Sequence, residues 1–328
     1  MTDTRHRILA VLISHCGEFV SGGKLANDLG VSRVSIKHHM DHFATLGFQI
    51  EAVRNRGYRL LEMPNTFEAD AFLHHFGGSL PSEQCCLFDS VDSTNMELDR
   101  RLNRGEPAPL LAIAGSQTHG KGRRGNVWHS EDGENLYLSL GFRPHLTVSR
   151  MGIYTLWIGL CLARLLREHA GVKVMVKWPN DLYLEDRKLG GILTEAKIDT
   201  DHVQHLIVGL GLNVNASSFT GELEQKAISL RMATGRLEAY NSLAAEIARE
   251  VLTASTAYFE APKEAEIQEM WGEYDFLAHR TVQARAANRV VSGVAAGIDE
   301  RGELRIRLDG NAFYTVHSGE VTMTFENE

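Results

Sequence analysis

The first 63 residues contain no proline, and their apolar positions predict three helices followed by a hairpin. The first helix carries an apolar face over residues 8–13. A second helix spans 24–29 and closes at Gly30, and a third, capped by Ser32, runs to about Leu46. Two helices joined by a glycine-containing turn are typical of a helix-turn-helix.

A basic hairpin follows these helices. Two short extended segments, 49–53 and 58–60, flank Arg54-Asn55-Arg56-Gly57, a turn whose glycine can take a positive φ angle. In the third helix, Val34, Ile36, Met40 and Phe43 are expected to face inward, which leaves a polar outer face. Such donors suit base edges and phosphates, so the pattern favours a winged DNA-binding domain over a simple packing domain. The predicted DNA contacts are Ser32, Arg33, Ser35, Lys37, His38, Arg54 and Arg56.

From about Phe67 to Tyr274 the pattern mixes strands with helices. Short turns such as Glu185-Asp186-Arg187 join neighbouring strands, so the sheet should be mixed or largely antiparallel. This indicates an α+β fold and argues against a doubly wound one. The expected strands are 111–116, 136–142, 173–177, 188–196 and 203–210, and the expected helices are 154–169, 243–259 and 264–274.

Beyond Ala278 the chain is β-rich, with glycine turns between short segments at 281–286, 290–298, 304–308 and 313–316. This pattern predicts a small barrel. The expected organisation is therefore an N-terminal winged helix-turn-helix domain over residues 1–65, a central mixed-sheet α+β domain over 66–274 and a C-terminal, small SH3-like β-barrel over 275–328.

Composition and charge narrow the class of protein. The four cysteines, Cys16, Cys85, Cys86 and Cys161, lack the paired spacing of a zinc site or a disulfide framework, so a reducing cytoplasm fits best. The N-terminus has no signal-peptide pattern, and no run approaches the roughly 20 apolar residues of a membrane span. The net charge is −8, yet residues 1–65 hold eight Lys/Arg against six Asp/Glu. DNA contact is thus expected only in the N-terminal region, over residues 1–65.

The segment Gly120-Lys121-Gly122-Arg123-Arg124-Gly125 combines three glycines with three cations. Glycines let backbone N–H groups converge on phosphate oxygens, and arginine adds charge-assisted hydrogen bonds, so the loop is suited to an anion. It also matches G-x-G-x-x-G, but a dinucleotide fingerprint should open a helix, and here the chain leads toward another strand. A Walker A loop would need Lys-Ser or Lys-Thr, which is absent. An exposed basic loop is the remaining alternative.

These features and several further motifs resemble those of biotin protein ligases. Lys121 stands where that family more often has arginine. With the winged N-terminus ending in Gly57-Tyr58-Arg59-Leu60, the resemblance is to the bifunctional ligase-repressor class. The motifs that carry it are Asp92-Ser93-Thr94-Asn95, Gln117, Lys177-Trp178-Pro179-Asn180-Asp181-Leu182-Tyr183, Lys188-Leu189-Gly190-Gly191-Ile192-Leu193 and Gly209-Leu210-Gly211-Leu212-Asn213.

The resemblance implies a set of site residues. Arg123, Lys188 and Asp181 are the expected catalytic residues, and Asp181 is also a candidate to position Mg²⁺ or the incoming amine. Biotin is expected at Ser93, Thr94, Asn95, Gln117, Lys121, Arg123, Lys188, Gly209 and Gly211. ATP or the adenylate is expected at Gly120, Lys121, Gly122, Arg123, Arg124, Gly125, Trp128, Asn180 and Asn213.

Several of these residues have an ordinary structural interpretation as well. Thr94-x-x-Glu97 matches a capping box, Gln117 suits a solvated strand end, and Pro179-Asn180-Asp181 suits a turn. Lysine at a strand start, as at Lys188, is usually solvated. Trp178 is a candidate wall of the pocket, Gly209 and Gly211 are expected to admit a ligand, and the polar segment 216–227 is expected to be a mobile loop that orders over the adenylate.

The resemblance implies a two-step reaction and a regulatory role. Biotin and ATP would give biotinyl-5′-AMP, and a lysine of a biotin carboxyl carrier protein would then take the biotin. The N-terminal domain would repress biotin synthesis at operator DNA as a homodimer that forms on binding biotinyl-AMP. The alternatives are a ligase with a vestigial DNA-binding domain, a ligand-sensing transcription factor on an inactive ligase fold, and a lipoate ligase, which the Gly120–Gly125 loop disfavours.

Overall fold

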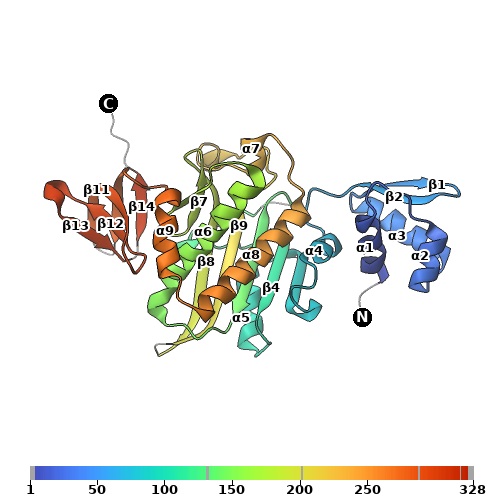
Figure 1. The fold of residues 1–328 in the computed structure, drawn as a ribbon, viewed down its shortest axis with the longest axis horizontal. Helices are drawn as coiled ribbons and strands as arrows, with labels where there is room; N and C mark the ends of the chain where they lie inside the picture. The colour runs from blue at the N-terminus through green and yellow to red at the C-terminus, as the bar shows by residue number, and fades with distance from the viewer. Residues whose placement is uncertain (1–3, 131–132, 201, 287–288, 318, 324–328) are drawn as a thin grey trace.

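The computed structural model describes residues 4–130, 133–200, 202–286, 289–317 and 319–323, arranged as three structural units along one long axis (Figure 1). The N-terminal unit contains α1 (Thr4–Ser14), α2 (Gly22–Leu29) and α3 (Arg33–Thr45), followed by the antiparallel strands β1 (Gln49–Val53) and β2 (Gly57–Glu62). Ser32 caps α3 through a bond from the N–H of Ser35, and Gly30 ends α2 in the left-handed region. The predicted helix, helix, helix, hairpin order is confirmed.

The inward face of α3 differs from the prediction at one residue. Ile36, Met40 and Phe43 are buried in a core shared with Ile8 and other residues of α1, as expected. Val34 is instead 80% exposed. Residues 34 and 36 lie about 200° apart around a helix, so both cannot face the same core.

The central unit is built on a seven-stranded sheet with strand order β3-β4-β5-β9-β8-β7-β6. Only the β3–β4 pair is parallel among these six pairings, which confirms a mixed, largely antiparallel sheet. The strands are β3 (Cys85–Val91), β4 (Leu110–Gln117), β5 (Leu136–Phe142), β6 (Met175–Lys177), β7 (Asp181–Leu184), β8 (Arg187–Asp199) and β9 (His202–Leu212).

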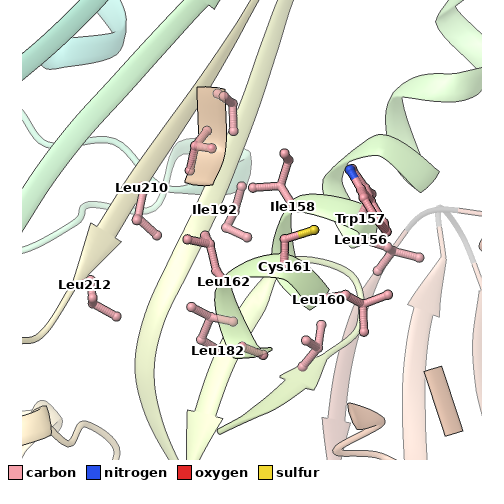
Figure 2. Close-up of a cluster of buried hydrophobic side chains, with 14 of the residues drawn as sticks. Leu156, Trp157, Ile158, Leu160, Cys161, Leu162, Leu182, Ile192, Leu210 and Leu212 are labelled. Atoms are coloured by element: carbon pink, nitrogen blue, oxygen red, sulfur yellow. The ribbon is translucent and has the colours of Figure 1, made fainter. Parts of the chain in front are cut away.

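Helices cover the two faces of this sheet unequally. The long helices α6 (Met151–Ala170) and α8 (Tyr240–Glu260) pack on one face, where Ile192 and Leu210 join Ile158 and Leu162 in the main core (Figure 2). On the other face, Leu98 and Leu102 of α5 (Thr94–Asn103) pack against Ile207 and its neighbours. The remaining helices are α4 (Ala69–Phe76), α7 (Leu230–Thr234) and α9 (Glu264–Tyr274), with short 3-10 turns at Ser82–Gln84, Arg123–Gly125, Val148–Arg150, Gly221–Leu223 and Asp309–Asn311.

The C-terminal unit is a five-stranded antiparallel sheet of order β13-β12-β11-β10-β14. Its strands are β10 (Thr281–Ala286), β11 (Arg289–Ile298), β12 (Leu304–Arg307), β13 (Phe313–Val316) and β14 (Glu320–Met323). The four predicted strands are present with β14 added, but the closed barrel is not confirmed. A barrel requires its edge strands to pair with each other, and within the described ranges the ladder leaves β13 and β14 as edges.

Two sets of contacts join the three units. Asp70 of α4, which is almost fully buried, forms an ion pair with Arg5 of α1. On the opposite side of the central unit, the N–H of Phe276 donates to Val176 at 3.0 Å. The Trp178 indole donates to the carbonyl of Gly302 at 2.9 Å, so Trp178 faces the C-terminal sheet and does not wall the predicted pocket.

Candidate functional site

Glycines on two neighbouring strands create a flat patch on the α5 side of the sheet. Gly191 of β8 lies opposite Gly211 of β9 in the ladder, with Asp181 of β7 as the next residue across from Gly191. A Cβ atom on Gly211 would lie 2.3 Å from Trp128 Cε2, and one on Gly191 would lie 3.3 Å from both Asp181 Oδ1 and Lys188 Cε. We call Gly191 and Gly211 the glycine patch. Because these two glycines have no side chains, Trp128, Asp181 and Lys188 can approach one another above the sheet.

The Gly120–Gly125 loop folds back on itself as a short hairpin. The N–H of Gly122 donates to Asn126 at 2.7 Å, and the N–H of Trp128 donates to Gly120 at 3.0 Å. Gly120 has no room for a side chain, because its Cβ would lie 2.4 Å from the Trp128 carbonyl oxygen. The hairpin delivers Trp128 onto the glycine patch. It opens no long helix, which agrees with the rejection of a dinucleotide fingerprint.

The three cations of this loop differ in their surroundings. Lys121 and Arg124 are exposed, and Arg124 has a φ angle of 56°. Arg123 is partly buried, and its Nη1 donates to Asn180 Oδ1 at 3.1 Å. Burial, followed by the neighbouring Arg124, lowers the pKa of Arg123, while Asp181 opposes that shift. Arg123 is therefore the loop cation that faces the patch and is held in place.

Lys188 and Asp181 form an ion pair beside the patch, with Nζ 2.8 Å from Oδ1. The same Nζ lies 5.4 Å from the centroid of the Trp128 ring, a cation–π distance. On the far side of Asp181, the Lys177 amine donates to the Tyr183 hydroxyl at 3.3 Å. Burial, and then the nearby Asp181 carboxylate, raises the pKa of Tyr183 to about 12. Tyr183 is thus a neutral donor and acceptor at physiological pH.

A buried polar network lies at the start of α5. Thr94 donates from both its N–H and its hydroxyl to Gln117 Oε1, at 2.9 and 3.2 Å. The Ser139 hydroxyl lies 2.7 Å from Thr94 Oγ1 and 2.6 Å from Asn95 Oδ1. Asn95 also donates to Glu195 at 2.8 Å. These bonds fix hydroxyl and amide groups inside a largely apolar region, which is what recognition of a polar ring requires.

The capping interpretation of this segment is wrong in detail. Ser93 occupies the N-cap position and makes no side-chain capping bond, while Thr94 is the first helical residue. The Thr94 hydroxyl is used by Gln117 and Ser139 instead. Glu97 turns away to pair with Arg100 and Arg101. The segment therefore begins α5 and joins the polar network at the same time.

Other predicted site residues have structural partners. A Cβ on Gly209 would lie 2.1 Å from Asn95 Oδ1, so the close approach predicted there is made by Asn95. Asn213 is buried and donates to the carbonyls of Lys188 and Ile228. Asn180 donates to the Ile192 carbonyl at 2.7 Å while accepting from Arg123. These residues position the strands and loops that carry the cations.

The segment 216–227 runs alongside the start of β8. The N–H of Lys188 donates to Lys226 at 2.7 Å, and the N–H of Ile228 donates back to Lys188 at 3.0 Å. The predicted loop therefore attaches at the backbone of the lysine whose side chain faces the patch. Its ordering over a ligand stays a prediction.

Sequence reasoning missed several residues of the site. Ser139 could have been found, since it is a polar residue in the otherwise apolar strand β5. Tyr183 and Lys177 stood inside a motif that was already singled out. Ser130, which accepts from Gln117 at 3.0 Å, and Glu195 carry no local signal, because only the folded sheet brings them to the network.

The candidate nucleic-acid interface lies at the other end of the molecule (Figure 1). Arg33, Lys37 and His38 of α3 are exposed, as are Ser32 and the turn residues Arg54 and Arg56, whereas Ser35 is only partly exposed. The Arg56 guanidinium lies 4.1 Å from the ring centroid of Phe19, so it is held against the segment between α1 and α2. Asn55 supplies the positive φ angle of the turn, at 66°, together with Gly57.

The described ranges hold neither a metal-binding cluster nor a membrane-spanning helix. They contain no cluster of three or more His, Cys, Asp or Glu side chains suited to a metal ion. None of the helices described is both long enough and apolar enough to span a membrane.

Comparison with protein families assigns all three units. Residues 87–213 match the biotin/lipoate A/B protein ligase family. Residues 4–59 match a helix-turn-helix (HTH) domain, and residues 280–323 match the C-terminal domain of biotin protein ligases.

Full-length relatives agree with this assignment. The chain is 31% identical to the bifunctional ligase/repressor BirA of Bacillus subtilis over 94% of this chain and 96% of that protein. It is 34% identical to the Escherichia coli protein of the same name, over 93% and 92% of the two chains. Among solved structures, the biotin protein ligase of Aquifex aeolicus in complex with biotin and ATP covers 73% of this chain and 98% of its own, with a TM-score of 0.63 and 24% identity. At that identity the match supports the fold.

Proposed function

This chain belongs to the bifunctional ligase/repressor family of biotin protein ligases, and we propose that it carries out both activities with the residues described above. Its substrates are biotin and ATP, and its acceptor is a lysine of a biotin carboxyl carrier protein. Its N-terminal domain binds DNA as a repressor. We place the domain boundaries near residues 65 and 275, because α1–α3 with β1 and β2 have their own core and the C-terminal sheet follows α9.

The observation that carries the ligase proposal is the group of side chains above the glycine patch. Lys188, Arg123 and the Trp128 ring converge there, with Asp181 paired to Lys188 at 2.8 Å. Two cations beside the Trp128 ring that covers the glycine patch suit a carboxylate and a phosphate brought together. We infer that biotinyl-AMP forms here, with its acyl phosphate next to Lys188 and Arg123.

The adenylation step needs no enzyme nucleophile. The biotin carboxylate attacks the α-phosphorus of ATP, the new carboxyl oxygen–phosphorus bond forms, and pyrophosphate leaves. Lys188 and Arg123 reduce the repulsion between the carboxylate and the phosphates and stabilise charge on the phosphoryl oxygens. Asp181 acts as a positioning residue by holding Lys188, and Asn180 does the same for Arg123.

The ureido ring of biotin presents two N–H donors and one carbonyl acceptor. We propose that it binds at the polar network of Thr94, Gln117 and Ser139, which already holds hydroxyl and amide groups at fixed positions. Ser93 and Asn95 shape the network from the start of α5, and Gly209 makes room for Asn95. An adenine ring would lie against Trp128, whose indole N–H is buried and has no hydrogen-bond partner among the residues that the structure describes.

Mg²⁺ is proposed to arrive with the nucleotide. This ion is usually held by one or two carboxylates together with substrate phosphates and water. Among the described residues, Asp181 lies beside the patch, with Oδ1 3.3 Å from where a Cβ on Gly191 would be, and it fits that role as a single ligand. The ion would neutralise phosphate charge when bound.

Operator binding is proposed to depend on a homodimer. The winged domain over residues 1–65 holds eight Lys/Arg and six Asp/Glu, so a single copy offers few phosphate contacts. Proteins of this kind usually bind two half-sites related by a twofold axis. Biotinyl-AMP would favour the dimer by ordering the 120–130 and 216–227 loops before subunits meet. The expected coupling is about 1–3 kcal/mol.

One preparation tests both halves of the proposal. The full chain is incubated with biotin, ATP, Mg²⁺ and a carrier domain, and labelling of the carrier is measured alongside binding to biotin-operon DNA. Sedimentation with and without the adenylate then measures dimerisation. Labelling without DNA binding would mean a vestigial N-terminal domain, and DNA binding without labelling would mean an inactive ligase. Equal dimerisation constants in the two states would refute the regulatory part.

A further inference from the structure

Val34 is an apolar side chain that the described part of the N-terminal unit leaves exposed. It is 80% exposed, although it lies in the first turn of α3. The other exposed large hydrophobic residue in the described part of the N-terminal unit, Leu61, is 48% exposed and lies on β2. Since α3 already buries Ile36, Met40 and Phe43, the core of this unit does not need Val34.

The outward face of α3 is defined by residues three and four positions apart. Val34, Lys37, His38 and Asp41 share this spacing, and all four are exposed. Arg33 does not cover Val34, because its guanidinium lies along the start of α2, with Nη2 2.9 Å from where a Cβ on Gly23 would be. The outward stripe therefore begins with a methyl-bearing side chain and continues with three hydrogen-bonding ones, Lys37, His38 and Asp41.

This position is the one from which a recognition helix contacts base edges. In helix-turn-helix proteins the N-terminal residues of the second helix reach the bases of the major groove, while cations on either side contact phosphates. The major groove contains one apolar group, the C5-methyl of thymine, and small apolar side chains recognise it by contact. Lys37 and His38 are hydrogen-bonding side chains, so Val34 is the member of the stripe suited to that methyl group.

We propose that Val34 recognises the C5-methyl group of a thymine in each half-site of the operator. The inference rests on the proposed DNA-binding function and adds a base identity to it. Burial of one methyl group corresponds to about a fourfold change in affinity, and two half-sites would give roughly 15-fold. The contact involves no charge, so it should leave the salt dependence of binding unchanged.

Uracil provides the test, since it differs from thymine only by lacking this methyl group. The full chain, saturated with biotin and ATP, is used to select duplexes from a randomised library. Each thymine of the enriched duplex is then replaced by uracil, and affinity is measured for the wild type and for Val34→Ser. The wild type should lose about fourfold at one thymine of each half-site, and Val34→Ser should show no loss at those positions.

Two control variants separate this contact from other effects. Leu61→Ser removes the other exposed apolar side chain and should keep the wild-type uracil profile. Lys37→Ala should weaken binding to all sequences and reduce the slope of log affinity against log salt by about 0.9, which Val34→Ser should not do. Equal uracil effects in wild type and Val34→Ser would overturn the proposal, as would loss of the same thymine effect in Leu61→Ser. A library without any enriched duplex would overturn the DNA-binding function itself.

Discussion

The ion pair between Lys188 and Asp181 makes the adenylation chemistry testable by one substitution. Lys188→Ala removes the amine that lies 2.8 Å from Asp181 and 5.4 Å from the Trp128 ring. It also leaves the Asp181 carboxylate unpaired at the point where phosphates are expected. We expect slower formation of biotinyl-AMP, with biotin binding in the absence of ATP affected less.

The structure separates the expected catalytic loss from the expected stability loss. The Lys188 side chain is 34% exposed and that of Asp181 is 21% exposed, so solvent screens the pair. Its contribution to the free energy of unfolding should not exceed about 1 kcal/mol. A charge-assisted hydrogen bond to the reacting phosphate contributes about 1.5–3 kcal/mol, which corresponds to roughly 10- to 150-fold in rate.

The assay is single-turnover release of pyrophosphate from ATP and biotin, without a carrier protein. Arg187→Ala is the matched control, because it removes the same charge from the adjacent residue, whose partner Glu185 lies at the surface. It should change the rate by less than about threefold. Asp181→Asn completes a double-mutant cycle. If Asp181 acts only by holding Lys188, the substitution should cost little more in the Lys188→Ala background, whereas a role as Mg²⁺ ligand would lower the rate further there.

Three results would refute this reasoning. Lys188→Ala could form the adenylate at the wild-type rate, which would remove Lys188 from the reaction. Arg187→Ala could slow the reaction equally, which would mean that the total positive charge on β8 matters and not the specific contact of Lys188. Thermal stability could fall in step with activity, which would make Lys188 a structural residue.

Two further substitutions test neighbouring parts of the site. Arg123→Gly should speed release of biotinyl-AMP by about 10- to 150-fold, because one charge-assisted contact is lost. Arg124→Gly is the control, and it should have a smaller effect because Arg124 is exposed. An unchanged dissociation rate in Arg123→Gly would exclude Arg123 from the adenylate site. Gly209→Ala places a methyl group 2.1 Å from Asn95 Oδ1 and should lower the free energy of unfolding in urea by about 1–3 kcal/mol. Gly272→Ala, on a helix with nothing within 4 Å of the new Cβ, should be neutral or stabilising, and equal losses in both variants would contradict the steric argument.

Local rules were sufficient for much of the fold. Ser32 and Gly30 mark the helix ends they were expected to mark, because capping depends on residues within a few positions. The strand predicted at 136–142 agrees with β5, since an apolar run of that length is typical of a central strand. Val34 was misplaced although helix geometry would have separated it from Ile36.

The site was less predictable because its partners come from distant segments. Thr94 reaches Gln117 and Ser139, and no local pattern indicates that its hydroxyl is used there and not in a cap. Gly209 was correctly expected to admit a close neighbour, but the neighbour is Asn95, which lies more than a hundred positions earlier in the chain. The closed barrel is not confirmed, since β13 and β14 remain edges of the sheet over the described residues, and strand number alone does not determine closure.

The hydrogen bond from the Trp178 indole to the Gly302 carbonyl fixes the segment that carries Asn180 and Asp181 against the C-terminal unit. Trp178 is only 4% exposed in the full chain, so a chain cut near residue 275 would remove the acceptor of its indole N–H and uncover the ring. The hydrogen bond between Phe276 and Val176, the middle residue of β6, would be lost with it. Truncation of the last domain should therefore loosen the geometry around the phosphates as well as shorten the protein.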